Sequence, residues 1–318
     1  MAATMTDDHL LIVSPDAATY AELASRADLG FREVRSAADV QGARHHAAPC
    51  NIVLGVPALV AECLDVLPRL DWVQSTYAGV DALCDTGLRR DYTLTGVKGI
   101  FGELMREYVI GWILALERDL FAVREDQHER RWAPRPFRPL TGLTLGVCGL
   151  GSIGEAVARA GSALGMRVVG YRRSEAPCAA VDRCYTGDAF TEFLAEADHV
   201  VITLPETTAT TGLFDAGALA AMKDDAVLIN VGRGRVVDEA ALVDALRERG
   251  LRAAVLDVFA CEPLPETSPL WTLPNAYLTP HNAAPSFPEE VFARFVANYR
   301  RYRSGEPLVD VVDFARGY

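Results

Sequence analysis

Short apolar runs alternate with segments of helical periodicity along most of the chain. In the first hundred residues the apolar runs lie at 10–13, 51–54 and 72–74, and the segments 17–27 and 57–67 repeat their apolar residues at helical spacing. Such alternation is typical of a parallel β-sheet whose strands are connected by helices. The pattern therefore predicts an α/β domain in this part of the chain.

The same alternation resumes after residue 142 with stronger strand signals. Nearly continuous apolar runs predict strands at LTLGVCG (143–149), RVVGY (167–171), HVVITLP (199–205), AVLINV (226–231), AAVLDVF (253–259) and AYLTP (276–280). Strands of this kind are typical of a sheet covered by helices on both faces. The segment 238–248 begins with acidic residues and is followed by Gly250, which predicts one of the helices.

A helical segment and a proline-rich passage separate these two regions. Residues 103–120 predict a helix, whereas the passage 128–142 (HERRWAPRPFRPLTG) contains prolines that exclude a regular helix. We interpret this passage as a connection between two domains. Its arginines could form an anion-binding patch, but such residues more often belong to a solvated or interface surface.

Length and charge limit the class of protein. At about 100–200 residues per domain, 318 residues favour two domains, although a single (β/α)₈ barrel of about 250 residues or more would also fit. Lysine and arginine number 31 against 43 aspartates and glutamates, giving a net charge of −12. This charge disfavours a surface for nucleic acid or anionic membranes.

Cysteine usage and the N-terminal residues predict a cytoplasmic location. The seven cysteines are scattered and contain no C-x-x-C pair, which favours reduced thiols. The chain starts without the features of a signal peptide, and no apolar stretch approaches the ~20 residues that span a membrane. The histidines and cysteines are not at ligand spacings, so no metal site is expected.

A glycine motif that begins at the end of the 143–149 run predicts a dinucleotide site. It reads Gly149-Leu150-Gly151-Ser152-Ile153-Gly154 and is followed by helical periodicity. Such a motif needs a tight turn at its first glycine, room for a pyrophosphate at its second, and close packing of the helix at its third. A purely structural turn from strand to helix is the alternative.

The residues after the 167–171 run predict which dinucleotide is preferred. An NAD enzyme places an acid there for the ribose 2′-hydroxyl, but this sequence has Arg172, Arg173 and Ser174. Two guanidinium groups and a hydroxyl would bind a 2′-phosphate, so NADPH is expected to be preferred over NADH. In the alternative, both arginines are merely exposed and Glu175 binds the ribose.

Three later segments contain the residues that indicate an enzyme. They are NVGRGRVVDEAAL (230–242), LDVFACEPLP (256–265) and LTPHNAA (278–284). Their order and spacing resemble the D-isomer-specific 2-hydroxyacid dehydrogenase family. The resemblance extends over nearly the whole chain and includes YAGVD (77–81) and LPET (204–207), while GELMREY, SPLW and DFARGY resemble the glyoxylate/hydroxypyruvate reductase A branch.

The resemblance implies catalytic roles for Arg233, Glu262 and His281. Reduction of a 2-keto acid needs a cation for the carboxylate, a proton donor for the keto oxygen and a hydride donor at the carbonyl carbon. Arg233 would hold the carboxylate with its planar fork and polarise the carbonyl. His281 would donate the proton, and Glu262 would orient the imidazole and stabilise its charged form.

The resemblance also implies binding residues. Ala78 and Gly79 would present backbone N–H groups to the substrate carboxylate. Asp257 would contact the nicotinamide carboxamide, unless it only caps the end of its strand. Further cofactor contacts are implied at Leu204, Pro205, Val231 and Gly232.

The fold expected from all of this is an α/β fold in which a Rossmann-type doubly wound parallel sheet domain is inserted into a smaller flavodoxin-like α/β domain. The resemblance places residues 1–102 and 287–318 in the substrate (catalytic) domain and residues 103–286 in the dinucleotide-binding domain. It implies a homodimer formed through the helix at 103–120. The expected reaction is NADPH-dependent reduction of glyoxylate or hydroxypyruvate to the D-2-hydroxy acid.

Two alternatives to this function stay open. The first is the same chemistry on a bulkier 2-keto acid, because a pocket lined by residues such as Tyr77, Phe101 and Phe287 cannot be sized from sequence. The second is a dinucleotide-sensing binding protein, since a fold does not fix its function.

Overall fold

A computed structural model describes residues 6–317 of the chain. It divides into two compact units, one built from the chain up to Ile100 together with the chain from Ser286 onward, and one built from Phe101–Pro285. The second unit is therefore inserted into the sequence of the first. The expected boundaries lay at 102/103 and 286/287, and the divisions in the structure lie at 100/101 and 285/286.

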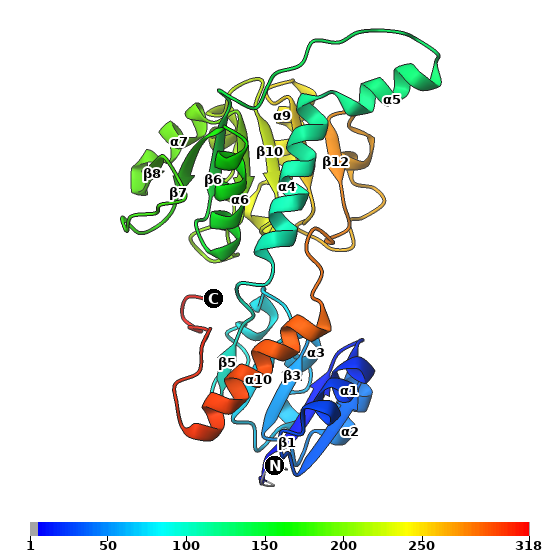
Figure 1. The fold of residues 1–318 in the computed structure, drawn as a ribbon, viewed down its shortest axis with the longest axis vertical. Coiled ribbons are helices and arrows are strands. Elements are labelled where there is room, and N and C mark those ends of the chain that lie inside the picture. Colours follow the sequence, from blue (N-terminus) through cyan, green and yellow to red (C-terminus); the bar gives the residue numbers. More distant parts are fainter. Residues whose placement is uncertain (1–5, 318) are drawn as a thin grey trace. The chain divides into compact units, whose positions relative to one another are not determined.

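Within the described residues, the first unit contains a five-stranded parallel sheet in the order β2-β1-β3-β4-β5 (Figure 1). This order is typical of flavodoxin-like sheets. The strands are β1 (His9–Val13), β2 (Glu33–Ala37), β3 (Ile52–Gly55), β4 (Trp72–Ser75) and β5 (Thr93–Thr95). The helices are α1 (Ala17–Ala27), α2 (Val40–His46), α3 (Pro57–Ala61) and α10 (Pro288–Ser304), with 3-10 turns at Leu64–Val66 and Asp81–Leu83.

Aromatic side chains attach α10 to this sheet. Phe295 is fully buried against Trp72 of β4, with ring centroids 5.2 Å apart, and Tyr299 stacks on Phe31 at 4.3 Å. The Tyr299 hydroxyl donates to Asp8 Oδ2 at 2.9 Å, so the polar end of this buried ring is also satisfied. The last helix of the chain is thus part of the core of the first unit.

In the described part of the second unit, a seven-stranded parallel sheet has the order β12-β11-β10-β9-β6-β7-β8 (Figure 1). The strands are β6 (Thr144–Cys148), β7 (Arg167–Tyr171), β8 (Arg183–Tyr185), β9 (His199–Ile202), β10 (Val227–Asn230), β11 (Ala253–Leu256) and β12 (Ala276–Leu278). The helices are α4 (Gly102–Glu117), α5 (Leu120–His128), α6 (Ser152–Ala163), α7 (Phe190–Glu196), α8 (Ala216–Ala220) and α9 (Glu239–Arg247), with 3-10 turns at Gly187–Ala189, Gly234–Val236 and Pro269–Thr272. Counted from β6, this is the doubly wound order 3-2-1-4-5-6 with β12 added, which confirms the predicted Rossmann-type fold.

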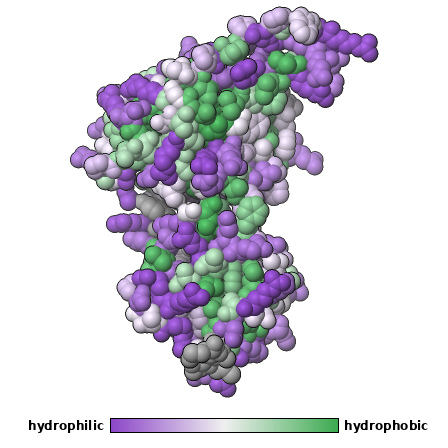
Figure 2. Space-filling model, viewed as in Figure 1, coloured by the Kyte–Doolittle hydropathy of each residue, from purple (hydrophilic) through white to green (hydrophobic). Residues whose placement is uncertain are grey.

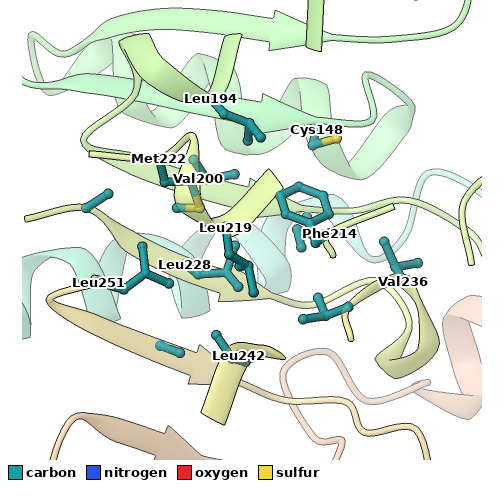
Figure 3. Packing of buried hydrophobic residues seen from close by; sticks show 14 of the residues in the cluster. Cys148, Leu194, Val200, Phe214, Leu219, Met222, Leu228, Val236, Leu242 and Leu251 are labelled. Carbon is teal, nitrogen blue, oxygen red and sulfur yellow. The ribbon is translucent and has the colours of Figure 1, made fainter. Parts of the chain in front are cut away.

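Alternate residues of the central strands pack into cores on opposite faces of the second sheet. In β10, Leu228 belongs to one apolar cluster, whereas Val227 and Ile229 belong to the other. Figure 3 shows the first cluster, in which Leu228 lies among side chains such as Leu219 and Leu251. Because both faces of these strands are covered, nearly all of their residues are apolar.

The proline-rich passage 128–142 lies within the second unit, so its interpretation as a connection between domains is wrong. Its arginines form ion pairs with acidic residues of the same unit. Arg135 pairs with Asp126 at 2.9 Å, and Arg138 pairs with Glu117 at 3.0 Å. The prolines do exclude a regular helix, but these ion pairs hold the passage to its own unit.

The predicted helix at 103–120 corresponds to α4, which ends at Glu117, and α5 begins at Leu120. Asp119 lies between them in a left-handed conformation, with φ +52°, which a continuous helix cannot contain. Among residues 6–317, no helix combines the length and the apolar character needed to cross a bilayer.

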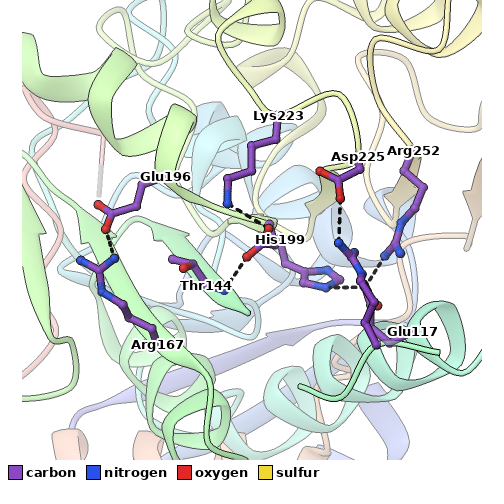
Figure 4. Close-up of polar contacts among 10 residues, drawn as sticks. Glu117, Thr144, Arg167, Glu196, His199, Lys223, Asp225 and Arg252 are labelled. Atoms are coloured by element: carbon purple, nitrogen blue, oxygen red, sulfur yellow. Dashed lines mark hydrogen bonds and ion pairs between the residues drawn. The ribbon is translucent and has the colours of Figure 1, made fainter. Parts of the chain in front are cut away.

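A buried carboxylate, Glu117 at the end of α4, joins several segments of the second unit (Figure 4). Its side chain is 1% exposed, lies 2.9 Å from His199 Nε2 and pairs with Arg138 and Arg252. Burial alone would raise the pKa of Glu117, but hydrogen bonds from these partners outweigh it and hold that pKa far below its ordinary value. Burial also lowers the pKa of His199, so a charged carboxylate lies beside a neutral imidazole.

Replacing Glu117 with glutamine is expected to destabilise the protein by about 3–5 kcal/mol, because two arginines would lose a buried anionic partner. Since the pKa of Glu117 is lowered in the folded state, this stabilisation is fully present above the ordinary carboxyl pKa of 4.5 and is lost as the pH falls towards the folded value. Denaturant unfolding at neutral and acidic pH measures it. Asp225→Asn is the matched control, since Asp225 also pairs with Arg138 but its side chain is 61% exposed. Equal losses in both variants would contradict this account.

Candidate active site

The turn between β6 and α6 contains the predicted glycine motif, and its glycines serve different needs. Gly149 has φ +104°, a left-handed conformation that favours glycine. A Cβ atom on Gly154 would lie 1.9 Å from the Gly149 carbonyl oxygen, so the close packing of the helix on the turn requires glycine. A Cβ atom on Gly151, in contrast, would meet no other atom within 4 Å. Gly151 therefore faces open space at the N-terminus of α6.

This open space fits the pyrophosphate of a dinucleotide. The first residues of α6, Ser152 and Ile153, have backbone N–H groups without partners inside the helix, and a helix N-terminus attracts anions. The turn also lies where the strand order reverses, between β6 and β9. Dinucleotides bind at such reversal points in doubly wound sheets.

The residues predicted to select the cofactor lie directly after β7, the neighbour of β6 in the sheet. Arg172 is half-buried, and its backbone N–H donates to Tyr185 O at 3.1 Å. Arg173, Ser174 and Glu175 are exposed. This segment therefore presents two guanidinium groups, a hydroxyl and a carboxylate at the carboxyl end of β7, next to the glycine turn.

Arg233 follows β10 in a turn that the Asn230 side chain holds. Asn230 Nδ2 donates to Arg233 O at 3.0 Å, and Asn230 Oδ1 accepts from Gly232 N–H at 3.1 Å. A Cβ atom on Gly232 would lie 2.6 Å from Leu204 O, so glycine allows the two segments to approach. The turn thus joins the segments that contain the implied cofactor contacts, with Val231 buried and Leu204 and Pro205 half-buried.

Asp257 follows β11 and is 2% exposed. Its Oδ1 accepts from Thr279 Oγ1 at 2.6 Å and from Asn282 N–H at 3.0 Å, and its Oδ2 accepts from Ala283 N–H at 3.1 Å. The carboxylate therefore fixes the chain on both sides of His281. The implied contact of Asp257 with the nicotinamide carboxamide stays a prediction.

His281 lies after β12 and pairs with Glu262. Its Nδ1 is 2.7 Å from Glu262 Oε2, and Glu262 Oε1 accepts from Phe259 N–H at 2.9 Å, which fixes the carboxylate. The His281 backbone has φ +51° and donates its N–H to Asp257 O at 2.9 Å. A left-handed conformation is strained for a residue other than glycine, and such strain concentrates at functional sites.

The pair of His281 and Glu262 is suited to proton transfer. Because a carboxylate accepts hydrogen bonds, Nδ1 of the ring carries the hydrogen that faces Glu262. Nε2 points to the other side of the ring and can exchange a proton with a bound molecule. The His281 side chain is 53% exposed and that of Glu262 is 35% exposed, so the pair is accessible.

Ala78 and Gly79, the predicted substrate contacts, follow β4 in the first unit. Ala78 is exposed and Gly79 is half-buried. The Ser75 hydroxyl donates to Tyr77 O at 2.7 Å and accepts from Tyr77 N–H at 3.0 Å, which holds the start of their segment. The chain around Ala78 and Gly79 is thus shaped by a local hydrogen-bonded turn.

Sequence reasoning missed residues that hold the segments of the candidate site. The Tyr108 hydroxyl on α4 lies 2.6 Å from Thr279 Oγ1, which in turn donates to Asp257. Asn230 and Glu239 bind backbone groups of the loops after β10 and β11. Asn230 and Glu239 belong to the same motif as Arg233, whereas no sequence signal links Tyr108 to Thr279. Over residues 6–317, no three His, Cys, Asp or Glu side chains are grouped so that they could hold a metal ion.

Residues 110–283 match the family model for the NAD-binding domain of D-isomer specific 2-hydroxyacid dehydrogenases. Glyoxylate/hydroxypyruvate reductase A of Escherichia fergusonii is 34% identical over 217 residues, which cover 68% of this chain and 70% of that protein. The residues matched by the family model include the glycine turn and the positions Arg233, Glu262 and His281.

Solved structures extend the similarity to both units. A D-isomer specific 2-hydroxyacid dehydrogenase family protein from Aeromonas salmonicida has a TM-score of 0.92 at 44% identity, covering 97% of this chain and 100% of that one. The NADPH-dependent glyoxylate/hydroxypyruvate reductase from Sinorhizobium meliloti, crystallised with NADP and sulfate, has a TM-score of 0.88 at 29% identity, covering 98% of this chain and 100% of that one. The protein is an NAD(P)-dependent oxidoreductase and belongs to the D-isomer specific 2-hydroxyacid dehydrogenase family.

Proposed function

We propose that this protein uses NADPH to reduce a small 2-keto acid, of the glyoxylate or hydroxypyruvate type, to the D-2-hydroxy acid. The observation that carries the proposal is the 2.7 Å contact between His281 Nδ1 and Glu262 Oε2, which leaves the other ring nitrogen to donate a proton. The similarity to proteins named glyoxylate/hydroxypyruvate reductase supports the substrate class. The glycine turn of β6 and α6 supports dinucleotide binding.

Each group of the candidate site has a defined role in the proposed mechanism. Arg233 binds the substrate carboxylate and polarises the keto group, since its planar fork matches a carboxylate. His281 donates the proton on Nε2 to the keto oxygen while the carbonyl carbon accepts a hydride, so that the C=O bond becomes an alcohol. NADPH, when bound, supplies that hydride. Glu262 stabilises the imidazolium before transfer, and Ala78 and Gly79 are proposed to donate backbone N–H groups to the carboxylate.

The charge on the loop after β7 predicts the choice of cofactor. A double variant, Arg172→Ala with Arg173→Ala, is expected to lower kcat/KM for NADPH by about 10–100-fold, because charge-assisted hydrogen bonds to a 2′-phosphate would be lost. The value for NADH should change little, since NADH has no phosphate there. Steady-state kinetics with both cofactors at fixed hydroxypyruvate measure the effect.

Arg159→Ala is the control for this experiment, because Arg159 lies on α6 and its side chain is 60% exposed. A wild-type preference for NADH would contradict the proposal. So would an equal loss with both cofactors in the double variant. A loss confined to NADH after Glu175→Ala would favour the alternative in which Glu175 binds the ribose.

A homodimer formed through α4 and α5 is part of the proposal. Leu120, Phe121 and Val123 of α5 are 51%, 45% and 46% exposed. Figure 2 shows further apolar side chains over the region of α4 on the viewed face. Apolar surface of this kind marks sites of association. Sedimentation velocity tests the assignment, which predicts a dimer that Phe121→Glu weakens.

Substrate size distinguishes the proposal from its alternatives. A panel of glyoxylate, hydroxypyruvate, pyruvate and phenylpyruvate should give the highest kcat/KM for the first two. Preference for phenylpyruvate would favour the same chemistry on a bulkier acid. Tight binding of NADPH without turnover of any 2-keto acid would favour a dinucleotide-sensing protein.

A further inference from the structure

Two adjacent acids at the start of α9 make different contacts. Asp238 caps the helix, because its Oδ1 accepts from Ala240 N–H at 3.0 Å and from Ala241 N–H at 3.1 Å. Glu239 points elsewhere, and its Oε1 accepts from Ala260 N–H at 2.6 Å. Glu239 thus binds the loop that follows β11 and leaves the capping of its own helix to Asp238.

The loop that Glu239 binds contains Glu262, the partner of the proposed proton donor His281. Phe259 N–H, one residue before Ala260, donates to Glu262 Oε1 at 2.9 Å, and Glu262 Oε2 lies 2.7 Å from His281 Nδ1. The position of the 259–260 backbone therefore sets the position of the Glu262 carboxylate. That carboxylate in turn sets the orientation of the imidazole.

The same loop packs against the turn that contains Arg233. A Cβ atom on Gly234 would lie 1.9 Å from the carbonyl carbon of Phe259 and 2.4 Å from Ala260 N, so the two backbones are in direct contact. Arg235 Nε donates to Ala260 O at 3.4 Å. Side chains from the Arg233 turn and from α9 thus hold both polar groups of the Ala260 backbone.

We propose that Glu239 is a positioning residue for the catalytic pair. It fixes the 259–262 loop on the Arg233 turn and thereby holds Glu262 in the orientation that His281 requires. The inference rests on the proposed function of that pair. A misplacement of about 1 Å in such a group can lower a rate by about 10²-fold, so loss of this contact should affect catalysis beyond any effect on stability.

Two substitutions at Glu239 separate its contact from its charge. Glu239→Ala removes the acceptor for Ala260 N–H, whereas Glu239→Gln keeps an amide oxygen that can accept the same hydrogen bond. If Glu239 acted only as an acid near the helix N-terminus, glutamine and alanine would be equally defective. Asp244→Ala is the matched control, because Asp244 lies on the same helix and its side chain is 72% exposed.

The measurements are kcat with NADPH and hydroxypyruvate, its pH profile, and the NADPH dissociation constant from fluorescence titration. Glu239→Ala is expected to lower kcat by about 10–100-fold and to alter the pH profile, with little change in NADPH binding. Glu239→Gln should stay within about threefold of wild type, as should Asp244→Ala. A wild-type kcat and pH profile in Glu239→Ala, or equal losses in the alanine and glutamine variants, would overturn the proposal.

A readout independent of turnover separates this inference from the proposed function. The ¹⁵N chemical shifts of the His281 ring, which report its 2.7 Å contact with Glu262, can be followed by NMR in wild type, in Glu239→Ala and in Glu262→Gln. In Glu239→Ala they are expected to move in the same direction as in Glu262→Gln, even if no 2-keto acid proves to be a substrate. Unchanged ring shifts in Glu239→Ala would overturn the positioning role.

Discussion

Replacing His281 with alanine is expected to lower kcat by about 10²–10⁴-fold, the usual contribution of a positioned general acid. The keto oxygen would lose its proton donor, and the Glu262 carboxylate would lose the imidazole that lies 2.7 Å away. NADPH binding should be retained, because the glycine turn lies between β6 and α6, whereas His281 follows β12. Single-turnover kinetics and fluorescence titration of NADPH measure the two effects separately.

His128→Ala is the matched control for this variant, since His128 is exposed on α5. It should leave kcat unchanged. Near-normal turnover in His281→Ala would refute its assignment as proton donor. A large loss of NADPH affinity in the same variant would mean that the histidine acts mainly in cofactor binding.

Replacing Arg233 with alanine is expected to lower kcat/KM by about 10³-fold and to impair both kcat and KM. Hydrogen bonds to charged groups contribute about 1.5–3 kcal/mol each, and two of them to one carboxylate account for a loss of this size. KM rises because the substrate carboxylate loses its partner, and kcat falls because the keto group is no longer polarised. Steady-state kinetics over a range of hydroxypyruvate concentrations separate the two.

Arg233→Lys tests whether the planar fork matters as well as the charge. Lysine keeps a cation but cannot form two parallel hydrogen bonds to a carboxylate, so this variant should recover only part of the loss. Arg247→Ala, at an exposed position on α9, is the control and should behave as wild type. Wild-type kcat and KM in Arg233→Ala would remove Arg233 from the mechanism.

The central strands of both sheets could be predicted from sequence, and several edge strands could not. The strands β2, β5 and β8 lie at sheet edges and were not among the predicted ones. An edge strand has only one neighbour, so its sequence need not be apolar throughout. In β2 (EVRSA) every residue before Ala37 is exposed or half-buried, and β8 (RCY) has three residues. Neither gives the continuous apolar run that identified β10.

The candidate site shows a similar limit. The types and order of Arg233, Glu262 and His281 could be predicted from three sequence motifs. Each motif follows a predicted strand of one parallel sheet. The residues that hold them depend on tertiary packing. Tyr108 and Thr279 are far apart in sequence, yet their hydroxyls lie 2.6 Å apart, and nothing in either segment predicts that contact.

The net charge of the chain does not describe the charge at its proposed binding sites. The chain has a net charge of −12, yet a 2-keto acid and NADPH are both anions. Their proposed binding depends on local positive groups, namely Arg172, Arg173, Arg233 and the N-terminus of α6. The composition disfavours a nucleic-acid surface but says nothing about such local sites.

The most direct test of the central claim is the oxidation of NADPH by the wild-type protein in the presence of hydroxypyruvate, with chiral analysis of the product. The account predicts sustained turnover that forms D-glycerate, and turnover with glyoxylate under the same conditions. Absence of NADPH oxidation with every 2-keto acid of the panel, by protein that binds NADPH, would contradict it.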